Sequence, residues 1–485
     1  MEQYSVTFLP SGTSVTVPAG TTVLQAQIQA GLHPDAPCGG KGTCGKCRVE
    51  LDGREVLACQ TPVDRNMTVR LTVSGQNRIL TEGLAVQVKP DGEGGYALAF
   101  DIGTTTVVCY LLDGHTGALL AQASTVNPQS QFGADVISRI QEVLDTGTEE
   151  LKHCIRTALT KLTQEVCRKA GIRPEEVSTA AIVGNTAMHH LLLGIDPRPL
   201  VTPPYMPGVF EALELDAEDI LPISGKVRIL PNIAGFVGGD TVGCMASTRF
   251  DQLDELTLMI DIGTNGEMVL GDKHRRIACS TAAGPAFEGA KISCGMRGAD
   301  GAVDHVKVEN GEITYHVIGE GEAIGLCGSG LLDLVAALLD TEIVDESGYL
   351  EDGVYRLGNT PVALTQKDIR EVQLAKAAIR AGIELLASHL GVKLEDIRQV
   401  YLAGAFGNYL SPASACRIGM IPPILLNRIK PIGNAAGEGA KLSALSRAEF
   451  DYAKVLAAET EFLELASLPE FQDCYVDALE FAEEE

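Results

Sequence analysis

Residues 97–112 read ALAFDIGTTTVVCYLL: an apolar run, a short polar turn and a second apolar run. Both runs have the length of strands, and the turn carries Asp101 followed by Gly103. A carboxylate is a ligand that Mg²⁺ accepts, and glycine permits close approach of the backbone to a phosphate. Thr104, Thr105 and Thr106 add hydroxyl and N–H donors for phosphate oxygens. The stretch predicts a hairpin that faces a nucleotide, and a hairpin without a ligand is the competing interpretation.

A second copy of this stretch favours the nucleotide. Residues 256–270 read LTLMIDIGTNGEMVL, with Asp261, Gly263, Thr264 and Asn265 in the turn. A repeat at this spacing predicts two similar subdomains rather than a solenoid. Two turns that face each other would hold a triphosphate and its metal from opposite sides. Asp101 and Asp261 are therefore the first candidate catalytic carboxylates.

A third motif, YLAGAFGN at residues 401–408, follows the two turns. In this order the three motifs resemble the phosphate-1, phosphate-2 and adenosine motifs of the actin, sugar-kinase and heat-shock ATPase superfamily. The resemblance covers roughly residues 96–450. It implies a duplicated ribonuclease-H-like fold that binds a nucleotide between the two turns, with further contacts from Gly404, Ala405 and Gly407.

A Gly-Gly turn in residues 231–240, PNIAGFVGGD, presents Asp240 just before an expected helix. The N-cap of that helix is one role for this carboxylate. Its other role, by resemblance to related ATPases, is to orient the water that attacks the γ-phosphate. Both roles stay open. His189 and His190, at the start of another expected helix, are weaker candidates as metal ligands, because histidines on helix faces more often pack.

The N-terminal part contains a loop rich in cysteine and glycine. Residues 37–47, PCGGKGTCGKC, place Cys38, Cys44 and Cys47 at C-x5-C-x2-C spacing, and Cys59 supplies a fourth thiol. Four thiolates suit an iron–sulfur cluster or a closed zinc site. The glycines let the backbone wrap a bulky cluster. The loop resembles that of β-grasp 2Fe-2S ferredoxins, although its first gap is one residue longer than the plant-type spacing, and this resemblance implies a 2Fe-2S cluster on the four cysteines.

Composition limits the classes of function. The chain has 485 residues and 45% hydrophobic content, enough for two or three domains with real cores. Its 38 Lys and Arg against 64 Asp and Glu give a net charge of -26, which argues against a nucleic-acid or anionic-membrane partner. The N-terminus lacks a signal-like segment and no apolar run approaches about 18 residues, so we expect a cytoplasmic protein. The 13 cysteines then suggest thiolate ligands rather than disulfides.

These observations divide the chain into four parts. We expect a ferredoxin-like domain over residues 1–75 and a linker over residues 76–95. A first ATPase subdomain with the phosphate-1 motif follows over residues 96–255, and a second with the phosphate-2 and adenosine motifs over residues 256–485. The fold class is α+β in the first part and α/β in the ATPase half.

Nearly the whole chain resembles the ATP-dependent reductive activators of corrinoid-dependent enzymes. The motifs that carry this resemblance are the cysteine spacing, DIGTTT, DIGTNGE, STAAGPAFEG, CGSG and LAGAFGN, in that domain order. It implies one-electron reduction of Co(II) corrinoid to Co(I), coupled to ATP hydrolysis, with a 2Fe-2S cluster and Mg-ATP as cofactors. The implied partners are the corrinoid protein of a methyltransferase system and a cellular electron donor, and a homodimer stays open.

One departure and two alternatives accompany this resemblance. Some relatives insert a longer linker and a middle domain between the ferredoxin and ATPase halves, whereas this chain is expected to have only the short linker. A small-molecule kinase with a regulatory redox domain is the first alternative, and a stable phosphorylated product would identify it. An actin-like assembly protein that senses redox state is the second, and it would form ATP-dependent filaments.

Overall fold

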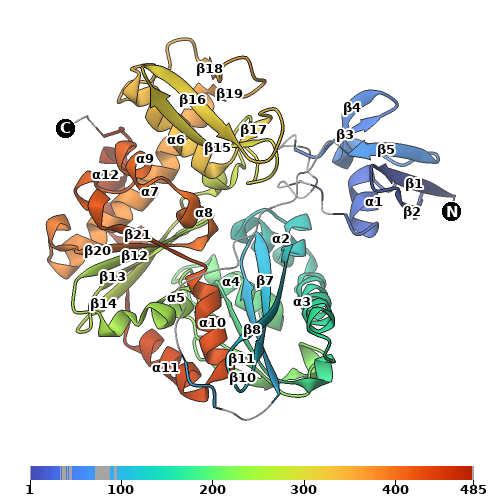
Figure 1. The fold of residues 1–485 in the computed structure, drawn as a ribbon, viewed down its shortest axis with the longest axis horizontal. Helices are drawn as coiled ribbons and strands as arrows, with labels where there is room; N and C mark the ends of the chain where they lie inside the picture. Colours follow the sequence, from blue (N-terminus) through green and yellow to red (C-terminus); the bar gives the residue numbers. More distant parts are fainter. Residues whose placement is uncertain are drawn as a thin grey trace.

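The computed structural model of the chain describes residues 2–32, 34, 36, 40, 42, 46–71, 88–91 and 95–482 (Figure 1). Three lobes are visible: a small N-terminal lobe in dark blue and two larger α/β lobes that face each other across the centre. Most of the expected linker over residues 76–95 lies outside the described residues.

The N-terminal lobe is a five-stranded sheet in the order β2-β1-β5-β3-β4, with α1 packed on it. Its elements are β1 (Gln3–Leu9), β2 (Thr13–Pro18), α1 (Val23–Gln29), β3 (Arg48–Leu51), β4 (Arg54–Leu57) and β5 (Met67–Leu71). Val6 and Phe8 alternate with polar residues along β1 and are fully buried. Thr22 and Gln25 cap α1 reciprocally, as a capping box does. A mixed sheet crossed by one helix is the β-grasp arrangement that the cysteine loop led us to expect.

The second lobe is a six-stranded sheet in the order β10-β11-β9-β6-β7-β8. β6, β7 and β8 form an antiparallel meander, while β9 runs parallel to β6 and β11 runs parallel to β9. The strands are β6 (Tyr96–Ile102), β7 (Thr106–Asp113), β8 (Leu119–Val126), β9 (Val177–Gly184), β10 (Leu213–Asp216) and β11 (Lys226–Ile229). The helices of this lobe are α2 (Val136–Thr146), α3 (Glu149–Ala170), α4 (Thr186–Leu193) and α5 (Gly239–Thr248).

The third lobe repeats the same sheet order. In β21-β20-β12-β13-β14-β22, the meander β12-β13-β14 takes the place of β6-β7-β8, and the parallel strands β20 and β21 take the places of β9 and β11. These strands are β12 (Thr257–Ile262), β13 (Gly266–Gly271), β14 (Arg276–Thr281), β20 (Gln399–Ala403), β21 (Ile429–Gly433) and β22 (Glu461–Phe462). The duplication that the two similar turns predicted is confirmed.

Additional elements of the third lobe flank this sheet. The helices are α6 (Gly328–Asp340), α7 (Gln366–Leu390), α8 (Gly404–Tyr409), α9 (Pro412–Arg417), α10 (Ala435–Leu445), α11 (Arg447–Ala458) and α12 (Pro469–Asp477). One small sheet contains β15 (Ala302–Glu309), β16 (Glu312–Val317) and β17 (Gly325–Leu326). A second small sheet contains β18 (Val354–Arg356) and β19 (Ala363–Thr365).

The two large sheets enclose a shared core. Leu98, Phe100 and Ile102 of β6 point outward to a core with α3, whereas Ala97 and Ala99 point inward. The inward residues of both sheets pack with α5, α10 and α11 between them, and α6 and α7 cover the outer face of the third-lobe sheet. Helices α5 and α10 are seen between the sheets in Figure 1.

Helices α5 and α10 cross at glycines. A Cβ at Gly439 of α10 would lie 2.3 Å from the carbonyl oxygen of Gly243 in α5, so a side chain at this point would push the helices apart. Since each helix also packs on a sheet, this close crossing sets the distance between the sheets. It brings the turn after β6 opposite the turn after β12.

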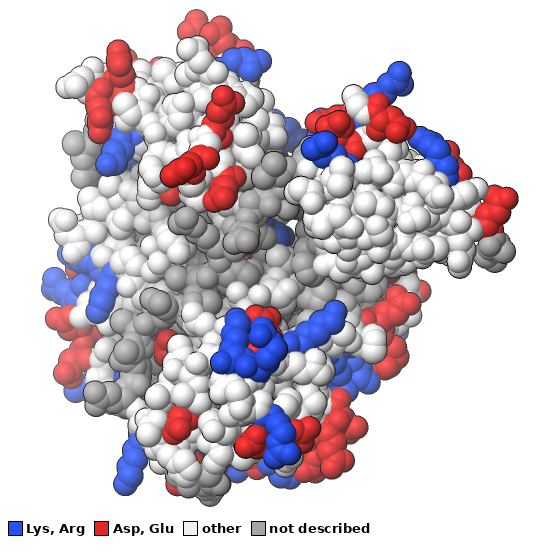
Figure 2. Space-filling view, turned by 45° about the vertical axis from the view of Figure 1, so that its right-hand side comes forward, with Lys and Arg blue, Asp and Glu red and all other residues white. Residues whose placement is uncertain are grey.

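Two of the longer helical segments show where helices end and begin. Gly147 ends α2 in a conformation with φ of 90°, so α2 and α3 are separate helices. Thr365 caps the long helix α7. Among the described helices, none combines the length and apolar character needed to cross a membrane. On the face in Figure 2, acidic and basic side chains are interspersed over both large lobes.

Candidate functional site

Strand alternation places Asp101 and Asp261 on facing surfaces of the two sheets. In β6 the inward positions are Ala97, Ala99 and then Asp101. In β12 the inward position Met259 is followed two residues later by Asp261. The two carboxylates therefore end equivalent strands of the two copies and line one cavity of about 350 Å³.

The turns after both strands have similar hydrogen bonding. The Gly103 amide donates to the Thr106 carbonyl at 2.8 Å, and the Gly263 amide donates to the Asn265 carbonyl at 2.9 Å. These tight turns present hydroxyls and amides to the cavity, as phosphate-binding loops do. All seven residues predicted for the two turns line the cavity: Gly103, Thr104, Thr105, Thr106, Gly263, Thr264 and Asn265.

Arg139 supports the first turn from behind. This fully buried side chain of α2 donates to the carbonyls of Thr104, at 2.6 Å, and Gly133, at 2.9 Å. Burial lowers the pKa of Arg139 to about 10, so the group is charged at neutral pH. A buried cation beneath the turn adds positive potential where phosphate oxygens would lie. Nothing in the local sequence indicated that this arginine, the only one of α2, would contact the first turn.

The cavity carries several acidic groups whose pKa values are raised. Burial raises the pKa of Asp101 to about 6, although a hydrogen bond from Asn434 opposes this shift. Burial and then the charge of Asp101 raise the pKa of Asp261 to about 7. For Asp240, burial followed by the charges of Asp261 and Asp101 raises the pKa to about 7. Burial and repulsion by Asp240 and Asp261 raise the pKa of Glu267 well above its usual range.

These carboxyls supply the kind of oxygen ligand that a hard divalent cation takes, although as they stand in the described residues no three of them have a metal-binding arrangement. Mg²⁺ takes oxygen ligands, and a cation among these groups would offset the repulsion that raises their pKa values. Glu267 is a residue that the sequence interpretation missed. It lies directly across from Asp261 in the β12–β13 pair, where the first copy has Val108 across from Asp101. Period-two alternation in the quoted motif DIGTNGE was the signal for it.

Asp240 lies in the cavity wall and does not cap its helix. Gly238 is the N-cap residue of α5, and Asp240 is in the first turn, where its Oδ1 accepts from the Thr241 amide at 2.8 Å. The N-cap alternative is therefore wrong. With Gly238 as the N-cap, α5 begins at Gly239, two residues earlier than it would with Asp240 as the N-cap; a Cβ at Gly238 would lie 2.6 Å from the Asn185 Cα.

Asn434 is a second residue that the sequence interpretation missed. Its Nδ2 donates to Asp101 Oδ2 at 2.8 Å and to the Tyr110 hydroxyl at 3.2 Å, while its Oδ1 accepts from the Gly437 amide and caps α10. The Asn434 side chain thus links α10 to the Asp101 carboxylate. Glu438 of the same helix is absent from the cavity lining and pairs with Lys441.

The three residues predicted for the adenosine motif have different positions. Gly404 lines the cavity with φ of 81°, and a Cβ there would lie 2.4 Å from Asp261 Oδ1. Ala405 follows in α8, and its side chain is not among the described atoms. Gly407 does not line the cavity; a Cβ at this residue would lie 3.3 Å from the Leu402 Cβ, so its described neighbour is the strand before it.

Both ring nitrogens of His190, and Nδ1 of His189, contact polar groups of the protein. Asn232 Nδ2 lies 2.7 Å from His189 Nδ1, and the Gly208 amide donates to His190 Nε2 at 2.8 Å. Burial lowers the pKa of His189 to about 4. Within the described part of the chain, no group of three or more His, Cys, Asp and Glu has a metal-binding arrangement.

Only part of the predicted cluster site is described. Cys38 and Cys44 lie outside the described residues, whereas Cys47 and Cys59 are buried in the core of the β-grasp lobe and are in no disulfide. Gly40 lies beside Cys59 with φ of 84°, a backbone conformation that favours glycine, and a Cβ there would lie 3.2 Å from Leu24 Cδ2 and 3.8 Å from the Cys59 Cβ. Buried cysteines without a disulfide, beside a loop that needs glycine for its backbone conformation, fit a thiolate-ligated cluster.

Fold and site together define a class: a ferredoxin-type domain attached to a duplicated nucleotide-binding ATPase fold. Three family models match the chain in order. They are the 2Fe-2S iron-sulfur cluster binding domain over residues 6–64, the RACo middle region over residues 96–253, and the C-terminal domain of RACo, the ASKHA domain, over residues 255–485.

Similar proteins agree with these matches. The corrinoid activation enzyme RamQ of Eubacterium limosum is 38% identical over 414 residues, which are 79% of this chain and 69% of that protein. A [Co(II) methylated amine-specific corrinoid protein] reductase of Methanosarcina barkeri is 27% identical over 423 residues, 80% of this chain and 77% of that protein. The solved structure of a reductive activator for corrinoid, iron-sulfur protein has a TM-score of 0.74 and 29% identity, covering 99% of this chain and 98% of that one. The chain belongs to the RACo family of reductive activators of corrinoid-dependent enzymes.

The family match corrects the expectation that a middle domain is missing. The RACo middle region covers residues 96–253, the part interpreted from sequence as the first ATPase subdomain. The RACo middle region and the first ATPase subdomain are the same residues. The sheet of this region has the strand order of the sheet in the C-terminal ASKHA domain, and this similarity accounts for the ATPase-type turn in its sequence.

Proposed function

We propose that this protein reduces the Co(II) corrinoid of a partner protein to Co(I) with one electron from a 2Fe-2S cluster, and that hydrolysis of Mg-ATP drives the reaction. A cluster held by Cys38, Cys44, Cys47 and Cys59 would supply the electron that reduces cobalt, and a cellular donor would replace that electron. In parallel, ATP and water give ADP and phosphate. The relatives named as activators or reductases of corrinoid proteins support this substrate.

The observation that carries the proposal is the convergence of Asp101 and Asp261 on one cavity from equivalent strands of two facing sheets. In this cleft the two carboxylates would hold Mg²⁺, which would shield phosphate charge. The turn from Gly103 to Thr106 and the turn from Gly263 to Asn265 would bind phosphate oxygens through hydroxyls and amides. Gly404 leaves room for the nucleoside side of the ligand, with Ala405 and Gly407 in the same motif.

Asp240 is the proposed water-orienting residue. Its carboxyl lies in the same cavity wall as the two metal-binding carboxylates, and its pKa of about 7 suits a group that accepts a proton near neutral pH. The Thr241 amide holds Oδ1, which leaves Oδ2 as the acceptor for a water. An Asp240→Asn variant should bind Mg-ATP and hydrolyse it slowly.

The cluster domain supplies the electron. Cys38, Cys44, Cys47 and Cys59 are the proposed ligands, and a 2Fe-2S cluster held by them would carry the single electron that cobalt requires. A plant-type ferredoxin has a potential of roughly −400 mV, and each 59 mV uphill costs about a factor of ten in the equilibrium constant. Reduction of a couple whose potential is much lower than that of the cluster therefore needs a second source of free energy, which ATP would supply.

Two variants test the separation of roles. Asp101→Ala should abolish ATP-dependent Co(I) formation and leave the visible absorption of the cluster unchanged. Cys59→Ala should abolish the cluster absorption and leave Mg-ATP binding intact. Loss of the cluster in the Asp101 variant would contradict the assignment of roles, and a stable phosphorylated small molecule in place of phosphate would point to the kinase alternative.

A further inference from the structure

Glu288 joins the two phosphate turns. Its carboxylate accepts hydrogen bonds from the Thr105 hydroxyl and the Thr264 hydroxyl, each at 2.5 Å, and these threonines belong to different sheets. A phosphate between the turns would need the same two hydroxyls as donors. The negative charge of that phosphate would also repel the Glu288 carboxylate, which lies between the same two turns. Glu288 and a terminal phosphate therefore compete for one place.

The residues after Glu288 form a closely packed segment. Gly289 has φ of 77°, and a Cβ there would lie 2.6 Å from the Met296 carbonyl oxygen. A Cβ at Gly295 would lie 2.3 Å from the Gly289 carbonyl oxygen, so the two ends of the segment are in backbone contact. Because no side chain separates these ends, displacement of Glu288 would move residues 285–296 together.

The carbonyls of residues 292 and 295 in this segment contact the N-terminal lobe. Lys46, the residue before the cluster cysteine Cys47, donates from Nζ to the carbonyl oxygens of Ile292, at 2.9 Å, and Gly295, at 2.7 Å. A lysine ammonium bound to two carbonyls is a polar attachment that depends on the geometry of the segment. Segment 285–296 thus contacts the nucleotide cleft through Glu288 and Met296, and the cluster lobe through the carbonyls of residues 292 and 295.

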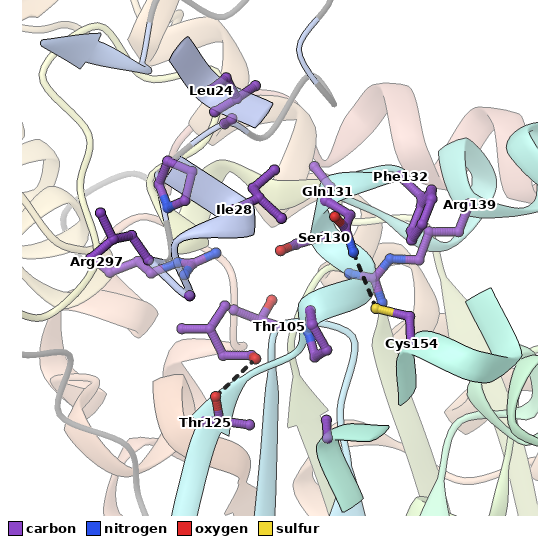
Figure 3. Close-up of a pocket in the computed structure, with 18 of the residues that line it drawn as sticks. Leu24, Ile28, Thr105, Thr125, Ser130, Gln131, Phe132, Arg139, Cys154 and Arg297 are labelled. Atoms are coloured by element: carbon purple, nitrogen blue, oxygen red, sulfur yellow. Dashed lines mark hydrogen bonds between the residues drawn. The ribbon is translucent and has the colours of Figure 1, made fainter. Parts of the chain in front are cut away.

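The space beside this attachment is open. A cavity of about 650 Å³ lies between α1 of the N-terminal lobe and the sheet of the second lobe. In Figure 3, Leu24 and Ile28 lie above Thr105, and Arg297 lies at the left. Thr105, Glu288 and Arg297 also line the nucleotide cavity, so the two cavities share a wall. The described core of the N-terminal lobe draws on that lobe alone. Release of the lobe would therefore break no shared hydrophobic core.

We propose that Glu288 senses the terminal phosphate of ATP and that segment 285–296 transmits its displacement to Lys46, which frees the cluster lobe from the ATPase lobes. ADP, which lacks that phosphate, leaves Glu288 on both threonines and the lobe attached. The inference rests on the proposed function, because it requires ATP in the cleft. It assigns ATP the additional role of deciding when the cluster lobe is free to move toward a partner.

Hydrogen–deuterium exchange of the full-length, cluster-loaded protein tests this role, with Mg-ADP or a non-hydrolysable Mg-ATP analogue. The ATP analogue, and not ADP, should speed exchange at the amides of Gly289, Ala290, Gly295 and Met296 about tenfold, as expected for loss of one hydrogen bond's stabilisation. Glu288→Ala should show fast exchange in this segment with either nucleotide. Lys46→Met should speed exchange in α1 with either nucleotide and keep the nucleotide response of the segment.

Lys291→Met is the matched control, since Lys291 lies in the same segment and pairs with Glu371 at 3.7 Å rather than with the cluster lobe. It should behave as the wild type. Calorimetric titration of the wild type with the ATP analogue separates two failures. No binding would overturn the proposed function itself. Binding with equal exchange for ADP and the ATP analogue, or a wild-type response in Glu288→Ala, would overturn the sensing role of Glu288 alone.

Discussion

Replacing Asp261 with asparagine should stabilise the protein when Mg²⁺ and nucleotide are withheld. The asparagine keeps the shape of the side chain and removes a negative charge that lies across from Glu267 and near Asp240. Burial and the charge of Asp101 raise the pKa of Asp261 from 3.8 to about 7. The carboxyl therefore binds its proton more tightly in the folded protein than in the unfolded chain.

The sign of the pH dependence follows from this difference. A raised pKa in the folded state favours folding below the unfolded value near 4, and this benefit is lost as the pH rises to about 7. At about 1.4 kcal/mol for each pH unit of difference, the charge of Asp261 costs up to about 4 kcal/mol at pH 8 and about 2 kcal/mol at pH 5. Asparagine has no such cost.

Urea unfolding followed by circular dichroism measures the effect. Asp261→Asn should raise the free energy of unfolding by up to about 4 kcal/mol at pH 8, by about half of that at pH 5, and should lose the stabilisation that Mg-ADP gives the wild type. Asp352→Asn, at an exposed turn, is the control and should change stability by less than about 0.5 kcal/mol. Destabilisation of Asp261→Asn at pH 8, or an equal gain at both pH values, would refute the electrostatic reasoning.

Three further predictions concern single residues. Gly404→Ala should cost about 2 kcal/mol or more and weaken nucleotide binding, because its Cβ would collide with the Asp261 carboxylate, whereas Gly391→Ala, also at positive φ but in open space, should cost about 1 kcal/mol by thermal unfolding. Burial lowers the pKa of His189 from 6.5 to about 4, so this residue should contribute a loss of about 3 kcal/mol between pH 7 and pH 4, measured as the difference between the wild type and His189→Gln; the same pH dependence in both proteins would contradict this. Cys59→Ala should abolish the cluster absorption and leave the urea midpoint of the ATPase lobes unchanged. A lower urea midpoint of the ATPase lobes in this variant would show that the lobes unfold together.

The facing carboxylates could be predicted from the sequence because they depend on local rules. In both copies the aspartate stands at the end of an alternating apolar strand, so strand periodicity fixes the surface on which it lies. The duplication then places Asp101 and Asp261 on equivalent strands. The same alternation could have identified Glu267, which is two residues before the inward-facing Val269.

Residues that reach the cavity from distant elements could not be predicted in this way. Asn434 meets Asp101 only because α10 crosses α5 at glycine, and the two residues are 333 positions apart in sequence. Glu288 stands in the quoted motif STAAGPAFEG, and its role as a bridge depends on how the two lobes meet. The role of Asp240 as an N-cap was wrong because the helix begins at Gly239.

The most direct test of the central claim follows cobalt itself. Anaerobically reconstituted protein, a reductant and a Co(II) corrinoid protein are mixed, and the Co(I) absorption band is recorded with and without Mg-ATP. The account predicts Co(I) only with Mg-ATP, and none with Asp101→Ala or Asp261→Ala despite an intact cluster spectrum. Co(I) formed equally well without ATP, or no Co(I) from any corrinoid partner despite an intact cluster and ATP turnover, would contradict it.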